Sequence, residues 1–227
     1  MVFAGAAFAG RALAATPPKE TGLSFEGLLK HQPGFQPRRP APEPRELPGF
    51  LSRRQLARTY AVYRDAFANL LAAEHSLATA SRAPADRVAY ARLRRDQIEA
   101  ANSVLLHEFY FRNLASTRVQ PPQYVTANFN EHMGSFGSWR EDFAACARIA
   151  ETWAVLVYDP YDDRWHNAAL GASDAGGWVG ANPLVVCAIA DYAWSIDYRD
   201  RDTYVDAFLG RIDWNEVDAR YHAVDRQ

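Results

Sequence analysis

The sequence predicts an α+β fold, in which an N-terminal antiparallel helical hairpin precedes a C-terminal α/β domain with a three-stranded antiparallel sheet. Apolar residues recur at helical spacing along two long segments, 52–71 and 86–114. Beyond residue 150, three short apolar runs are typical of strands, and turns rich in Pro, Asp and Gly separate them. Helices first, then strands flanked by helices, is the order of an α+β protein.

Composition and charge narrow the class of function. A chain of 227 residues holds one domain, or two small ones that share a core. Its formal net charge is −2, whereas a nucleic-acid-binding protein usually carries a basic excess, so we expect no nucleic-acid partner. The two cysteines, Cys146 and Cys187, lie in apolar surroundings that favour buried free thiols, although two residues leave both a disulfide and their redox state open.

The N-terminal fifty residues divide into two parts. Residues 1–15, "MVFAGAAFAGRALAA", resemble the apolar region and cleavage site of a secretory signal without its basic start, which predicts export, most simply to a periplasm. The alternative is an Ala-rich tail on a cytoplasmic protein. The segment is too short to span a bilayer, so we expect no transmembrane span. Residues 16–50 are rich in proline and predict an extended arm.

The rest of the chain divides into a hairpin domain, 51–118, and an α/β domain, 119–227. Ser52 is a suitable N-cap for the first helix, and a short polar connection to the second implies an antiparallel pair. In the second part, a helix across "SWREDFAACARIAE" precedes the strands "WAVLVYD", "RWHNAAL" and "PLVVCAIA". Two short helices, near 201–210 and 214–222, end the chain.

Several separated motifs, in this order, resemble the iron/manganese superoxide dismutase family. The end of the chain, "DYRDRDTYVDAFLGRIDWNEVDARY", is similar to the family's pattern D-Y-x-N-x-x-x-x-Y-x-x-A-F-x-x-x-x-x-W-x-x-V-x-x-R-Y. "LLHEFYFRNL" resembles the ligand motif of the family's second helix, H-x-x-Y-[WF]-x-x-L, and "GSFGSWREDFAACA" and "TWAVLVYDP" resemble its next helix and first strand. The resemblance covers roughly residues 50–223 and implies the family's fold.

The resemblance also implies where a metal site would lie. The family holds its metal with three imidazoles and one carboxylate, and only one of these positions keeps its ligand here, His107. Alignment places Thr59 at the first-helix histidine, Ala188 at the carboxylate and Tyr192 at the last histidine. Phe67 stands where the family has its gateway tyrosine. We therefore expect a vestigial site and no bound cofactor.

The remaining donors do not suggest a replacement site. Asp191 aligns with the family's glutamate that crosses the dimer interface, so it points away from its own centre. The other histidines are scattered and show no ligand-like pairing: His31, His75, His132, His166 and His222. No G-x-S-x-G elbow is present to suggest a serine hydrolase.

Two functions follow from this resemblance. The first is a non-catalytic superoxide-dismutase-like protein that serves as a structural or interaction subunit, pairing with itself or an active paralogue or docking on a larger complex. The second is a superoxide dismutase with residual or partner-dependent metal-based activity. Asp191 and Tyr192 occupy the place of the family's dimer contact, which favours a changed partner.

Overall fold

A computed structural model describes residues 39–172 and 177–224. The expected signal segment, 1–15, and most of the expected arm lie outside the described residues, and of the arm only 39–50 is described. Within the described ranges, every helix is too short or too polar to span a bilayer.

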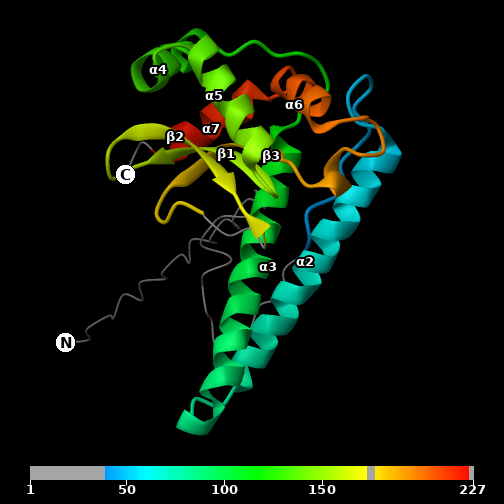
Figure 1. The fold of residues 1–227 in the computed structure, drawn as a ribbon, viewed down its shortest axis with the longest axis vertical. Coiled ribbons are helices and arrows are strands. Elements are labelled where there is room, and N and C mark those ends of the chain that lie inside the picture. The colour runs from blue at the N-terminus through cyan, green and yellow to red at the C-terminus, as the bar shows by residue number, and fades with distance from the viewer. Residues whose placement is uncertain (1–38, 173–176, 225–227) are drawn as a thin grey trace, which may run out of the picture.

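Two long antiparallel helices form the hairpin, as expected from the sequence (Figure 1). They are α2 (Arg53–Thr79) and α3 (Arg87–Asn113), and a short 3-10 turn, η1 (Pro84–Asp86), precedes α3. Ser52 caps α2, because its hydroxyl oxygen accepts a hydrogen bond from the backbone N–H of Gln55 at 3.1 Å. The apolar stripes of the two helices meet in a buried cluster that includes Tyr63, Phe67 and Val104.

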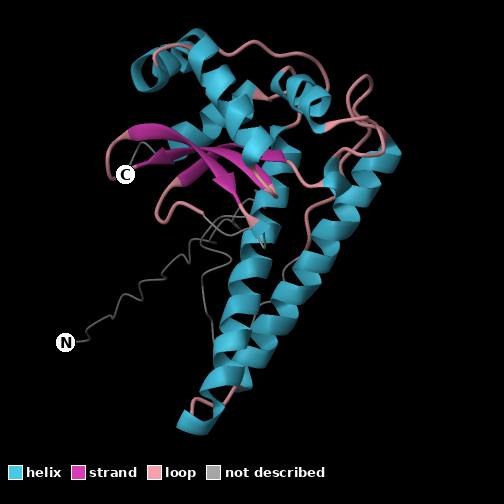
Figure 2. Cartoon of the chain, in the orientation of Figure 1, coloured by secondary structure: helices cyan, strands magenta, loops and turns pink. Residues whose placement is uncertain are grey.

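The sheet has three antiparallel strands in the order β2-β1-β3. Its strands are magenta in Figure 2 and labelled in Figure 1. They are β1 (Trp153–Asp159), β2 (Arg164–Leu170) and β3 (Asn182–Ala188). Every residue of the central strand β1 is buried, which explains why its sequence reads as a continuous apolar run instead of an alternating one. The expected α+β architecture is therefore confirmed.

Four helices pack around this sheet: α4 (Gln123–Met133), α5 (Phe136–Ile149), α6 (Arg201–Leu209) and α7 (Trp214–Val224). Their aromatic side chains share one core, in which Phe129 of α4 lies with its ring centroid 4.5 Å from that of Trp139 and 4.9 Å from that of Trp165. The sequence did not predict α4, because only Val125 and Phe129 of its eleven residues are buried and its apolar stripe is short.

A buried polar network joins the hairpin to the C-terminal domain. The Oδ1 atom of Asn113, at the end of α3, accepts hydrogen bonds from the backbone N–H of Val186 and from the Arg220 guanidinium, both at 2.9 Å. Arg220 also donates to the carbonyl oxygens of Leu184 and Phe109. This network fixes α3 against β3 and α7, and so positions the side chains that α3 directs toward the sheet.

Candidate functional site

The four aligned residues come from elements that pack against one another: α2 contacts α3 and the short turn after β3, and α3 contacts β3. Thr59 comes from α2, His107 from α3, Ala188 from the last position of β3, and Tyr192 from the short 3-10 turn η3 (Asp191–Ala193). Thr59, His107 and Ala188 are fully buried, and Tyr192 is partly buried. The segments that carry these residues are far apart in the sequence, and the hairpin and the sheet bring them together.

His107 has one partnered ring nitrogen and one without a partner. Its Nδ1 lies 2.7 Å from the carbonyl oxygen of Ser103, one turn earlier on α3, so Nδ1 carries the proton and donates. Nε2 therefore carries a lone pair, and it is buried with no hydrogen-bond partner among the residues that the structure describes. Burial lowers the pKa of His107 to about 4, only partly opposed by the Ser103 bond, which leaves the ring neutral at pH 7.

Aromatic rings surround His107. Trp153 of β1 meets the imidazole edge to face, with ring centroids 4.8 Å apart, and Tyr192 stacks on it at 5.6 Å with planes 21° apart. The ring centroids of Phe111 and Tyr63 lie 6.0 and 6.1 Å from that of His107. The imidazole thus packs as one ring of an aromatic cluster.

Thr59 faces the backbone of Tyr192. Its hydroxyl lies within hydrogen-bonding distance of the carbonyl oxygens of Gln55, at 3.1 Å, and of Tyr192, at 3.3 Å. The Gln55 side chain donates to the same Tyr192 carbonyl at 2.6 Å and accepts from the backbone N–H of Ile196 at 2.8 Å. Thr59 and Gln55 therefore hold η3 against α2, a role for Gln55 that the sequence analysis missed. The sequence offered one indication of this role: Gln55 is four residues from Thr59, so the two side chains lie on the same face of the helix.

Ala188 brings no donor to the centre, and Trp153 lies beside it. The two residues are paired across β1 and β3, and both are fully buried. The neighbouring Cys187 alternates to the opposite face of the strand, where its sulfur lies 4.0 Å from the Tyr204 hydroxyl. Burial raises the pKa of this thiol, so it stays protonated.

Phe67 is buried one turn along α2 from Tyr63, with the two ring centroids 6.1 Å apart. The Tyr63 hydroxyl donates to the buried carboxylate of Glu108 at 2.7 Å and accepts from the backbone N–H of Ala41 at 2.6 Å. Tyr60 holds the other side of Ala41, because its hydroxyl donates to the Ala41 carbonyl at 2.8 Å. The arm therefore crosses the hairpin at these tyrosines, and Glu108 is a second buried polar residue that sequence reasoning missed.

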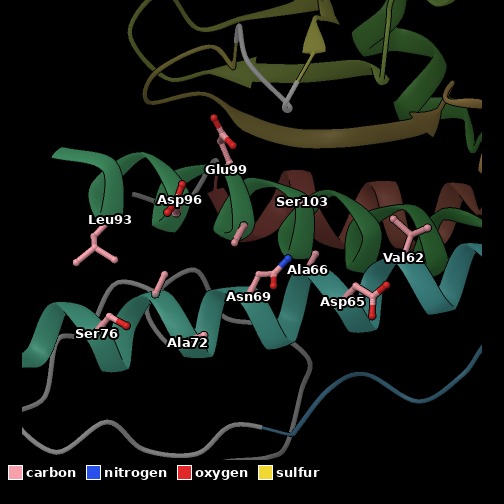
Figure 3. Close-up of a pocket in the computed structure, with 12 residues that line it drawn as sticks. Val62, Asp65, Ala66, Asn69, Ala72, Ser76, Leu93, Asp96, Glu99 and Ser103 are labelled. Carbon is pink, nitrogen blue, oxygen red and sulfur yellow. The ribbon is translucent and has the colours of Figure 1, made fainter. Parts of the chain in front are cut away.

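Asp191 lies apart from this centre, on the exposed side of η3. A cavity of about 610 Å³ opens elsewhere, between α2 and α3 toward the tip of the hairpin (Figure 3). Carboxylates and small side chains line it, among them Asp65, Asp96 and Glu99, and its edge at Ser103 is one turn from His107. Small residues such as Ala66 leave this space because they do not fill the gap between the helices.

Within the described ranges, only one group of three or more His, Cys, Asp or Glu side chains brings its ligand atoms within 4.8 Å of one another. That group lies at the turn between β1 and β2, and His107 is not part of it. The side chains that the structure places against His107 are aromatic rings, those of Trp153, Tyr192, Phe111 and Tyr63. Of the aligned positions, Thr59 has a hydroxyl that is already within hydrogen-bonding distance of two carbonyl oxygens, and Ala188 has only a methyl group. The centre therefore offers one imidazole nitrogen and no carboxylate from the aligned positions.

Residues 121–220 match the family model for the C-terminal domain of iron/manganese superoxide dismutases. A manganese superoxide dismutase of Halobacterium salinarum is 30% identical over 119 residues, which cover 52% of this chain and 60% of that protein. Iron superoxide dismutases of Aquifex aeolicus and Cupriavidus metallidurans are 28% and 31% identical, over 66% and 59% of this chain. The match spans 71% and 69% of these two relatives, but only about 60% of the haloarchaeal ones. On its fold and on these matches, the chain belongs to the iron/manganese superoxide dismutase family.

Proposed function

We propose that this chain is a non-catalytic member of the family, which uses the fold as a structural or interaction subunit. The observation that carries the proposal is the packing around His107: its imidazole contacts aromatic rings, and the aligned ligand positions hold a hydroxyl, a methyl group and a phenol. Under the alignment above, Thr59, Ala188 and Tyr192 are the replaced ligands.

The residues present do not fit an iron or manganese ion at this centre. Such an ion needs several nitrogen and oxygen donors, and His107 Nε2 is one donor. The Thr59 hydroxyl is engaged with two backbone carbonyls, and Ala188 has no donor atom. A single neutral imidazole in an apolar surround gives neither the affinity nor the charge balance for a divalent ion.

The residue at the aligned gateway position, where the family's tyrosine would relay protons, supports the same proposal. Phe67, at the aligned gateway position, has no hydroxyl to relay a proton. The nearest phenol on α2, Tyr63, is engaged with Glu108 and with the backbone of Ala41. The arm at Ala41 therefore occupies one face of the hairpin beside this aromatic cluster.

An interaction role follows from fold-level reasoning and from the outer face of η3. Asp191 is exposed there, and Tyr192 is partly buried behind it. We propose that this face contacts another protein, which is a second copy, an active paralogue or a larger assembly, and that the chain is exported to a periplasm. Affinity isolation of the native complex identifies the partner.

The decisive variant restores the missing ligands together. Thr59→His, Ala188→Asp and Tyr192→His in one chain supply three donors beside His107, and we expect this triple variant to bind about one manganese or iron ion per chain. The matched control is Thr59→His alone, which we expect to take up little metal, because two imidazoles hold such an ion poorly. A folded triple variant without metal would contradict the alignment of the site.

The alternative is a dismutase with residual or partner-dependent activity. The observation that favours it is the unpartnered Nε2 of His107, a buried lone pair that a metal would satisfy. Dismutase activity of the unmodified chain that a chelator abolishes and His107→Gln removes would establish this alternative and refute our proposal.

A further inference from the structure

The turn between β1 and β2 brings together an imidazole and two carboxylates. Asp159 ends β1, Asp162 lies in the turn, and His166 is the third residue of β2. One ligand atom from each side chain lies within 4.8 Å of the other two. Asp159 pairs with Arg164 across the strands, so His166, two residues further along β2, lies diagonally on the same face as Asp159.

Trp178, which precedes β3, holds two of these three side chains. Its indole Nε1–H donates to Oδ2 of Asp159 at 2.9 Å, and its ring stacks on His166 with centroids 4.4 Å apart and planes 21° apart. Asp159 is 7% exposed, and its other oxygen accepts from the backbone N–H of Tyr161 at 2.9 Å. Neighbours outside the triad therefore fix both the carboxylate and the imidazole, as outer partners do around metal ligands.

We propose that Asp159, Asp162 and His166 form a binding site for one divalent transition-metal ion of the zinc class. Imidazole nitrogen and carboxylate oxygen are donors that zinc and its neighbours accept, and the imidazole disfavours calcium and magnesium. Three protein ligands leave a coordination position for water. His166 Nε2 and Asp162 Oδ2 lie 2.8 Å apart, so the ion takes the place of the proton that these two atoms share.

The chain contains a second His–Asp pair that lacks the third donor. His222 Nε2 lies 3.0 Å from Asp218 Oδ1, also with a spacing of four residues. No third His, Cys, Asp or Glu completes a group around it among the residues that the structure describes. The two pairs have similar distances and partial exposure, so His222 serves as a control imidazole that lies outside the three-residue group.

The test is a zinc titration of the untagged full-length chain by calorimetry, with tryptophan fluorescence during a parallel nickel titration. We expect one high-affinity ion per chain, and quenching that Trp178→Phe removes, because Trp178 stacks on the ligand His166. His166→Gln and Asp162→Asn should each weaken zinc binding by at least about tenfold, a loss typical of damage to a metal site. His222→Gln, the matched control, should leave the affinity unchanged.

Two results would overturn the proposal. One is no zinc binding by the folded wild-type chain. The other is binding that His166→Gln and Asp162→Asn leave intact while both variants keep the wild-type circular dichroism spectrum. His107→Leu should not alter zinc binding at the turn. The zinc titration therefore tests the site at the turn independently of the proposal for His107.

Discussion

The buried imidazole of His107 predicts a specific dependence of stability on pH. Burial lowers its pKa to about 4 in the folded chain, whereas an exposed histidine in the unfolded chain titrates near 6.5. Between these values the unfolded chain binds the extra proton, so the folded state is fully stabilised above about pH 6.5 and loses stability as pH falls toward 4. The complete loss is about 3 kcal/mol, of which about 2 kcal/mol is reached at pH 5.

The perturbation is His107→Leu, which removes the titrating group. At pH 7 this variant loses the hydrogen bond to Ser103, which contributes about 1 kcal/mol to stability. It also removes Nε2, which has no hydrogen-bond partner among the described residues and whose burial costs about 1–3 kcal/mol. We therefore expect its stability at pH 7 to lie within about 2 kcal/mol of the wild-type value, and to fall by about 2 kcal/mol less between pH 7 and pH 5.

The assay is urea unfolding of both proteins at the two pH values. Titration of other groups, such as His132, whose pKa partial burial lowers, contributes equally to both proteins and cancels in the comparison. The control is His75→Leu, an exposed position on α2, which should keep the wild-type dependence on pH. Equal losses in the wild type and in His107→Leu would refute the description of His107 as a buried, neutral side chain.

Substitutions at three further positions test the packing by urea unfolding at neutral pH. Arg220→Met should destabilise by about 3 kcal/mol or more, because Asn113 and the carbonyl oxygens of Leu184 and Phe109 lose their shared donor; a loss below about 1 kcal/mol would contradict the network. Phe129→Ala should cost about 3–5 kcal/mol, since it empties the centre of the aromatic core, and a near-neutral effect would contradict the position of α4. Ser135→Ala should cost about 1 kcal/mol through the lost cap of α5, and Ser135→Gly less.

The fold could be predicted from the sequence because the periodicity of apolar residues and the helix cap indicate the same elements that tertiary packing stabilises. The stripe of α2 and its Ser52 cap, and the continuous apolar run of β1, each match the element that forms. The helix α4 was missed because Phe129 contributes most of its burial through contacts distant in sequence. Its start, after Pro122, lacks a side-chain cap that sequence inspection could find.

The candidate site was only partly predictable. Alignment with family motifs named His107, and the structure stacks the Tyr192 ring on it and places the Thr59 hydroxyl against the Tyr192 carbonyl. The roles of Gln55 and Glu108 were not predicted, because each depends on a partner far away in sequence. The expectation that the other histidines lack ligand-like pairing was wrong for His166, whose carboxylate partners come together only when the β1–β2 turn closes.

The iron and manganese content of the His166→Gln variant tests the central claim most directly. This variant removes the proposed site at the β1–β2 turn, so any tightly bound ion must lie elsewhere, and His107 is the expected place. The protein is loaded with each metal during refolding, dialysed and measured by elemental analysis. Our account predicts a content close to zero for both metals. About one iron or manganese ion per chain, lost on His107→Gln, would contradict it.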